Sequence, residues 1–72
     1  MDKIVISFCK NVKDLRLQHK YTQQQVAKKL EITYQSYQHY EMGLGFPSIP
    51  NLIKLADLYD ISLDELVGRK EY

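Results

Sequence analysis

Apolar residues recur three or four positions apart through most of the 72-residue chain, which is the spacing of helices that bury one face. This pattern predicts helices over residues 7–18, 23–30, 34–42, 49–59 and 63–67. A serine or threonine stands at or just before the start of each segment, where its hydroxyl can accept a hydrogen bond from a free helical amide. The predicted core consists of Phe8, Val12, Val26, Leu30, Tyr37, Ile49, Leu52, Ile53 and Ala56. We therefore expect an all-α fold that forms one domain over residues 1–72.

The two ends of the chain are expected to lie outside the helices. Residues 3–6 fit either a short extended arm or an early start of the first helix. Ser7 is a suitable N-cap, which favours an arm over residues 1–6. Gly68 ends the last helix, and residues 69–72 form a polar tail.

Residues 22–43 predict two short helices joined by a tight turn, and the rest of the chain is organised around them. Thr22 is the N-cap of the first of these helices, and Gln25, three positions later, completes a capping box. Thr33 begins the second helix in the same way. Gly43 ends it, as a glycine after the last helical residue commonly does.

The outer face of the second helix in this pair is polar but almost uncharged. A face built only for solubility would carry more lysine and glutamate. Glutamine can pair with the adenine edge in the major groove, and aromatic side chains can contact the thymine methyl group. This face therefore indicates base recognition, with a plain polar surface as the alternative. Its residues are Tyr34, Gln35, Gln38 and His39.

The stretch resembles the helix-turn-helix of the phage-repressor family of DNA-binding proteins, also called the Cro/cI or Xre family. Gln23 matches the glutamine with which that family begins its first motif helix, and Glu41–Met42–Gly43 matches its E-x-G ending. The resemblance extends over about residues 8–67. It implies a compact five-helix, lambda-repressor-like DNA-binding domain with the helix-turn-helix at helices 2 and 3.

By position, the resemblance implies one set of residues that read bases and another that contacts phosphates. The base-reading residues are Tyr34, Gln35, Ser36, Gln38 and His39. The phosphate-contacting residues are Thr22, Gln23, Lys28 and Tyr40. Lys28 is equally well explained as a solvated lysine. The ring of Tyr40 belongs in the core, with its hydroxyl directed to a phosphate.

Two positions depart from the family pattern. Leu44 stands where the family often carries a basic residue after the glycine, so the basic group of a second phosphate contact is missing there. Glu31 stands in place of the usual glycine of the tight turn. A left-handed glutamate is strained, which favours a turn that is built differently.

An internal ion pair between Arg16 and Glu41 is also expected. Arg16 adjoins the inner stripe of the first helix, and Glu41 lies one turn after Tyr37 on the inward side of the second motif helix. Both positions match a family pair that ties these two helices together. The alternative is two unconnected surface charges.

The formal net charge of +1 is small for a nucleic-acid-binding protein, but its distribution is polarised. Residues 1–20 carry five basic and two acidic side chains, and residues 44–72 carry three basic and five acidic ones. Residues 21–43 carry two of each. Such a field can orient a small protein on DNA despite a sum near zero.

Several classes of function are not supported by the sequence. Cys9 is the only cysteine and there are two histidines, so no disulfide within the chain and no metal cluster is predicted. No nucleophile triad, paired-carboxylate site or phosphate-binding glycine loop indicates an enzyme, and no cofactor is expected. No apolar run is long enough to span a membrane, and a cytoplasmic location is expected.

These observations favour a sequence-specific transcriptional regulator, most simply a repressor that binds a palindromic operator in double-stranded DNA as a homodimer. The alternative is a protein-binding module on the same fold, such as an antitoxin or an antagonist of another regulator. The expected dimer surface is the segment around the fifth helix, with Leu63, Leu66 and Val67.

Overall fold

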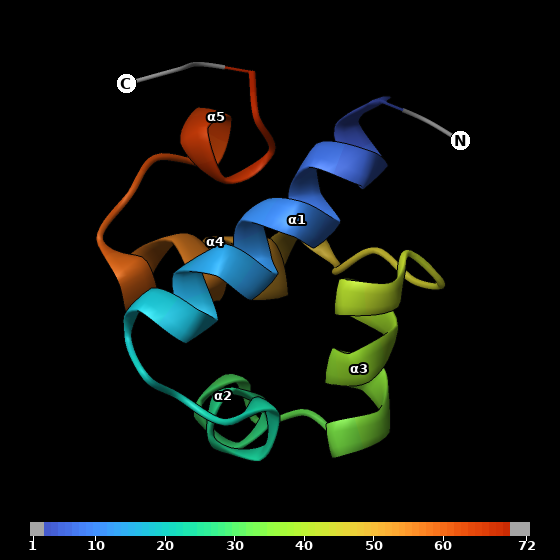
Figure 1. Ribbon diagram of the computed structural model, residues 1–72, viewed down its shortest axis with the longest axis vertical. Coiled ribbons are helices and arrows are strands. Elements are labelled where there is room, and N and C mark those ends of the chain that lie inside the picture. The colour runs from blue at the N-terminus through green and yellow to red at the C-terminus, as the bar shows by residue number, and fades with distance from the viewer. Residues whose placement is uncertain (1–2, 70–72) are drawn as a thin grey trace.

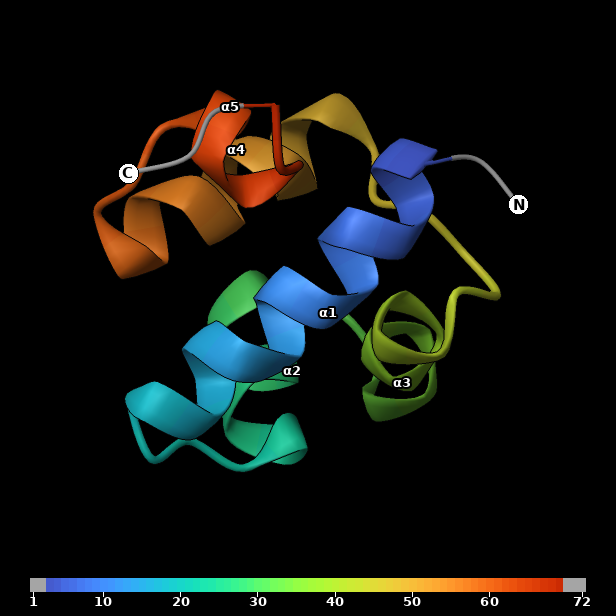
Figure 2. The ribbon, with the colours of Figure 1, turned by 45° about the horizontal axis from the view of Figure 1, so that its top comes forward.

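The computed structural model describes residues 3–69 and contains five helices and no strand in that range, which confirms the all-α prediction (Figure 1). The helices are α1 (Lys3–Gln18), α2 (Gln23–Leu30), α3 (Tyr34–Met42), α4 (Ile49–Tyr59) and α5 (Leu63–Leu66). In Figure 2, the α4–α5 pair lies above α1 and the α2–α3 pair lies below it. α1 packs against both α3 and α5, so the longest helix joins the two halves of the domain.

A single apolar core fills the space between the helices. Seven of the nine predicted core residues are buried there, and Leu55, Tyr59 and Leu66 join them from the C-terminal half. The ring of Phe8 packs against the ring of Phe46 at a centroid distance of 4.9 Å and against the edge of Tyr40 at 6.2 Å. These contacts hold the loop after α3 against α1.

The prediction for the face of α4 was wrong at two positions. Ile49 is 71% exposed and Ile53 is 44% exposed, whereas Leu55 and Tyr59 are buried. The buried residues of α4 lie on one face of the helix, because Leu55 and Ala56 come three and four positions after Leu52, and Tyr59 follows them at four and three positions. Ile49 and Ile53 share a neighbouring stripe, which the other helices do not cover. The buried residues of α4 are Leu52, Leu55, Ala56 and Tyr59.

The prediction of an arm over residues 1–6 was also wrong for residues 3–6, because α1 begins at Lys3. Ser7 lies inside the helix and is not its cap. Ser7 instead packs against the distant end of the chain, where a Cβ atom added at Gly68 would lie 2.7 Å from Cβ of Ser7. One turn later, Asn11 Nδ2 donates to the carbonyl oxygens of Glu65 and Leu66, at 3.3 and 3.2 Å. The N-terminal half of α1 therefore packs against the end of α5 and the residues that follow it.

The end of α5 also changes the expected dimer surface. Leu66 is fully buried and belongs to the core, so it cannot contribute to an exposed interface. Leu63 is exposed and Val67 is half-buried. α5 ends at Leu66, with Val67 as its cap. Residues 1–2 of the predicted arm and residues 70–72 of the predicted tail lie outside the described residues.

Candidate nucleic-acid interface

The α2–turn–α3 unit is fixed by hydrogen bonds that close within a few residues. Thr22 and Gln25 form a reciprocal capping box, with Gln25 N donating to Thr22 Oγ1 at 3.1 Å and Thr22 N donating to Gln25 Oε1 at 2.8 Å. Thr33 caps α3 by accepting a hydrogen bond from Ser36 N at 3.0 Å. Both helices have the bounds that the sequence predicted.

The expectation that Glu31 makes the tight turn differ from the family's turn was wrong. Glu31 adopts the left-handed conformation, with φ 59° and ψ 41°, and its N–H donates to the carbonyl oxygens of Ala27 and Lys28. Glu31 therefore takes the conformation that a glycine would take, at a steric cost. A positive φ also occurs at Lys20, two residues after the end of α1, and at Asp60, which caps α4.

The turn directs one side of α3 into the core and leaves the other side open. Tyr37 and Tyr40 are buried, with their rings edge to face at a centroid distance of 6.1 Å. On the other side, Tyr34 and Gln35 are exposed. Ser36, Gln38 and His39 are half-buried. α3 stands at the edge of the domain in both ribbon views (Figures 1 and 2).

The polar side chains on this open face differ in whether they already form hydrogen bonds within the protein. Within residues 3–69, the side chains of Gln35, Gln38 and His39 make no hydrogen bond to the protein. The hydroxyl of Ser36 accepts a hydrogen bond from the Thr33 hydroxyl at 2.9 Å. The hydroxyl of Tyr34 donates to Gln23 Oε1 at 3.3 Å. The three unengaged side chains are therefore free to bind a ligand.

A buried ion pair lies behind this face. Arg16 Nε lies 2.7 Å from Glu41 Oε2, and Arg16 Nη2 lies 3.2 Å from Glu41 Oε1. The two side chains are only 12% and 5% exposed. Arg16 Nη1 also donates to the Tyr21 carbonyl oxygen at 3.0 Å, and Gln23 Nε2 donates to Glu41 Oε1 at 3.1 Å. This network ties α1 to the beginning of α2 and to the end of α3.

The ion pair also changes the acid–base properties of its neighbours. Burial alone would raise the pKa of Glu41, but hydrogen bonds from Arg16 and Gln23 outweigh it and hold the pKa below its ordinary value. The Tyr37 hydroxyl has no hydrogen-bond partner among the described residues. Burial and the neighbouring Glu41 carboxylate raise the pKa of Tyr37. Burial likewise raises the pKa of Tyr59 to about 12. The cluster therefore keeps one negative charge, on Glu41, at neutral pH.

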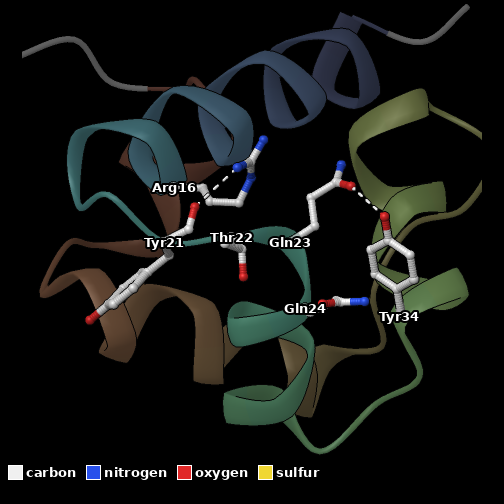
Figure 3. Close-up of a pocket in the computed structure, with 6 residues that line it drawn as sticks. All are labelled: Arg16, Tyr21, Thr22, Gln23, Gln24 and Tyr34. Carbon is white, nitrogen blue, oxygen red and sulfur yellow. Dashed lines mark hydrogen bonds between the residues drawn. The ribbon is translucent and has the colours of Figure 1, made fainter.

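A pocket of about 410 Å³ opens at the N-terminus of α2, beside this network (Figure 3). Its lining residues carry a guanidinium group, two amides and three hydroxyl groups. They lie at the start of a helix, where free backbone N–H groups favour an anion. The sequence interpretation placed Thr22 and Gln23 here but missed Gln24, which directly follows Gln23 on the first turn. The lining residues are Arg16, Tyr21, Thr22, Gln23, Gln24 and Tyr34.

The other predicted phosphate contacts lie apart from this pocket. Lys28 is exposed one turn further along α2, and Tyr40 is almost wholly buried. Leu44, which replaces the expected basic residue, is exposed in the loop after α3. Among the described residues, no group of His, Cys, Asp and Glu side chains could hold a metal ion. None of the described helices is long and apolar enough to cross a membrane.

The fold and this site define a helix-turn-helix domain, and comparison with known proteins agrees. The helix-turn-helix family model matches residues 12–66. The crystal structure of a transcriptional regulator from Listeria innocua is similar, with a TM-score of 0.84 and 32% identity, over 90% of this chain and 61% of that one. The chain therefore belongs to the helix-turn-helix family, of the Xre type.

Two curated relatives illustrate the relationship. The chain is 50% identical over 48 residues to the cryptic phage CTXphi transcriptional repressor RstR of Vibrio cholerae serotype O1, a match that covers 67% of this chain and 43% of RstR. It is 36% identical over 66 residues to the HTH-type transcriptional regulator ImmR of Bacillus subtilis (strain 168), covering 92% of this chain and 52% of ImmR. The chain spans about half the length of these relatives.

Proposed function

We propose that this chain is a sequence-specific DNA-binding transcriptional regulator, and a repressor in particular, which acts in the cytoplasm without a cofactor. The observation that carries the proposal is the set of unengaged polar side chains on α3, beside the open N-terminus of α2. In helix-turn-helix proteins the second helix of the motif enters the major groove, and its N-terminal residues meet base edges. The repressor activity named for RstR supports the direction of regulation.

In this proposal, Gln35 and Gln38 read base edges directly. Each carries an amide that can donate and accept at once, which matches the paired donor and acceptor of adenine in the major groove. His39 and Ser36 flank them, and Tyr34 lies at the N-terminal end of the same face. Because the Ser36 hydroxyl accepts from Thr33, its own proton is still available for a base or phosphate.

The N-terminus of α2 is proposed to bind the DNA backbone. The Gln23 amide has a second hydrogen besides the one it gives to Glu41, and this hydrogen can be donated to a phosphate. Thr22 and the free backbone amides of the first turn surround the same position. Lys28 adds a positive charge further along α2, and the Tyr40 hydroxyl is the remaining proposed phosphate contact.

We propose that the protein binds a palindromic operator as a homodimer, since a two-fold axis places two recognition helices in successive major grooves. Leu63 and Val67 remain from the predicted dimer surface. Sedimentation of the full chain, alone and with its operator duplex, tests this part. A monomer under both conditions contradicts the homodimer.

The central test is a binding experiment with DNA. Duplexes from the promoter region of the protein's own gene, and a pool of random duplexes, are mixed with the full chain, and bound sequences are recovered and titrated. We expect a preferred site with a much lower Kd than random DNA of equal length at the same salt concentration. Equal affinity for all duplexes would rule out sequence-specific binding.

A second candidate function, a protein-binding module such as an antitoxin or an antagonist of another regulator, is favoured by exposed apolar side chains. They lie at the end of α3, in the following loop and on α4. Contiguous exposed apolar groups are common at protein interfaces. Co-expression with a toxin or regulator encoded by a neighbouring gene tests this candidate, because a stable complex that binds no DNA would replace the first proposal. The exposed apolar residues at the end of α3, in the following loop and on α4 are Met42, Leu44, Ile49 and Ile53.

A further inference from the structure

The side-chain amide of Gln23 is held in one orientation by its two neighbours. Its Nε2 lies 3.1 Å from Glu41 Oε1, and its Oε1 lies 3.3 Å from the hydroxyl of Tyr34. An ionised carboxylate can only accept hydrogen bonds, so the amide must turn its nitrogen toward Glu41. The amide oxygen then faces Tyr34, and the Tyr34 hydroxyl must donate its only proton to that oxygen.

This orientation is anchored in the interior of the domain. Glu41 is nearly buried and is itself fixed by two hydrogen bonds from Arg16. Hydrogen bonds to charged groups are stronger than those between neutral groups, so Glu41 is the most firmly held member of the series Glu41, Gln23 and Tyr34. Gln23 passes this constraint to Tyr34, the first residue of α3, and Figure 3 shows the hydroxyl of Tyr34 directed at the Gln23 amide.

Tyr34 therefore offers DNA its ring and a hydroxyl group whose only proton is already donated to Gln23. The residue is 42% exposed at the N-terminal end of the open face of α3. A hydrogen bond from its hydroxyl to a base acceptor would require the bond to Gln23 to break. Apolar contact through the ring requires no such exchange. The one apolar group on the major-groove edge of standard base pairs is the C5-methyl group of thymine.

We infer that Tyr34 recognises the C5-methyl group of a pyrimidine, which is thymine in unmodified DNA, through its ring and not through its hydroxyl. The inference rests on the proposed function, because it assigns one base-reading role within the DNA interface. Gln23 engages the hydroxyl, so the ring is the part of the Tyr34 side chain that remains open to the base. The preferred site should accordingly contain a thymine near the N-terminus of α3.

The test begins with the preferred duplex selected by the full chain. Each thymine of a half-site is replaced in turn by uracil, which removes the methyl group and keeps every hydrogen-bonding atom. At one position the affinity should fall about four-fold per half-site, the ratio that burial of one methyl group supports. The same thymine–adenine pair is also replaced by cytosine–guanine and by 5-methylcytosine–guanine, which differ only in the C5-methyl group. The duplex with the methylated pair should bind more tightly than the duplex with the unmethylated one.

Variants of Tyr34 assign the effect to the ring. Tyr34→Phe keeps the ring and should keep the uracil effect, whereas Tyr34→Ala should bind the thymine and uracil duplexes equally at that position. Tyr34→Gln is a second variant without the ring. Because Tyr34 is exposed, both ring-less variants should keep the helical circular dichroism of the wild type. Asp57→Ala, at an exposed position on α4 outside the proposed interface, is the control and should leave the uracil effect unchanged.

The inference fails if the uracil effect is the same in the wild type and in Tyr34→Ala. It also fails if Tyr34→Phe loses the effect as fully as Tyr34→Ala, because the hydroxyl would then carry the recognition. In both cases sequence-specific binding still stands. If no duplex is preferred over random DNA, the proposed function itself fails, and the inference fails with it.

Discussion

Arg16 and Glu41 join the first and third helices through two hydrogen bonds, and both side chains are almost withdrawn from solvent. Arginine suits this role because its planar guanidinium group meets a carboxylate through two parallel N–H groups. Exposed ion pairs contribute about 0–1 kcal/mol, whereas loss of one partner of a buried pair leaves an uncompensated charge. The pair therefore fixes the inward side of α3 to α1.

We expect Glu41→Gln and Arg16→Met each to lower the free energy of unfolding by about 3–5 kcal/mol, because each leaves a buried charge without its partner. The double variant should cost less than the sum of the two single variants. Urea unfolding of the four proteins measures this coupling. A coupling energy near zero would show that the observed contact contributes nothing to stability.

The stability of the domain should fall as the Glu41 carboxylate is protonated. Its pKa is lower in the folded protein than in the unfolded chain, so the folded state binds the proton less readily. The stabilisation is fully present above the unfolded pKa of about 4.3 and is lost as the pH falls through the folded value. Urea unfolding between neutral and acidic pH should show this loss in the wild type.

Glu41→Gln should remove that part of the acid dependence, and Glu31→Gln serves as the control. Glu31 is exposed, and its carboxylate lies 3.9 Å from Lys54 Nζ, in a pair open to solvent. Its replacement should change the profile little. An acid profile of Glu41→Gln that parallels the wild type would assign the acid sensitivity to other carboxylates.

Glu31→Gly should stabilise the domain by about 1 kcal/mol, because glycine adopts the left-handed conformation without the Cβ clash that glutamate meets. The weak pair with Lys54 offsets only a little of this gain. Thermal unfolding measures the change. Lys28→Gly is the matched control in the helical part of α2, where glycine should destabilise by about 1 kcal/mol.

Gly68→Ala should destabilise the domain by roughly 1–3 kcal/mol, as overpacking typically does. The backbone at Gly68 has φ 77°, and an added Cβ would lie 2.7 Å from Cβ of Ser7 on α1. The double variant Ser7→Gly with Gly68→Ala should recover the steric part of the loss and retain the backbone part. If Gly68→Ala unfolds at the same denaturant concentration as the wild type, the close approach of Gly68 to Ser7 does not constrain the domain.

Gln35→Ala should weaken binding to the preferred DNA site by about 1–3 kcal/mol per half-site and leave non-specific binding unchanged. The reason is that Gln35 is exposed on α3 with both ends of its amide unengaged. Lys28→Ala is the comparison, since loss of a phosphate contact weakens binding to all sequences and reduces its salt dependence. An equal fall in specific and non-specific binding would show that Gln35 does not read bases.

The sequence by itself determined the helix-turn-helix, because its signals act over a few residues. Thr22 pairs with Gln25, and Thr33 pairs with Ser36, three positions away in each case. Gly43 closes α3 through a hydrogen bond to the carbonyl oxygen of His39. Interactions of this range can be recognised from residue spacing alone, which is why the bounds of α2 and α3 agreed with the prediction.

The tertiary structure decided the features that depend on contacts between distant segments. The packing of α1 against α5 involves Asn11, whose partner carbonyl groups lie 54 and 55 positions away. The exposure of Ile49 depends on which stripe of α4 the other helices cover, and the apolar pattern of α4 fits two neighbouring stripes. The engagement of the Tyr34 hydroxyl requires Gln23, 11 positions earlier, to be held by Glu41. Residue spacing describes one helix at a time, whereas these properties depend on how helices are placed relative to one another.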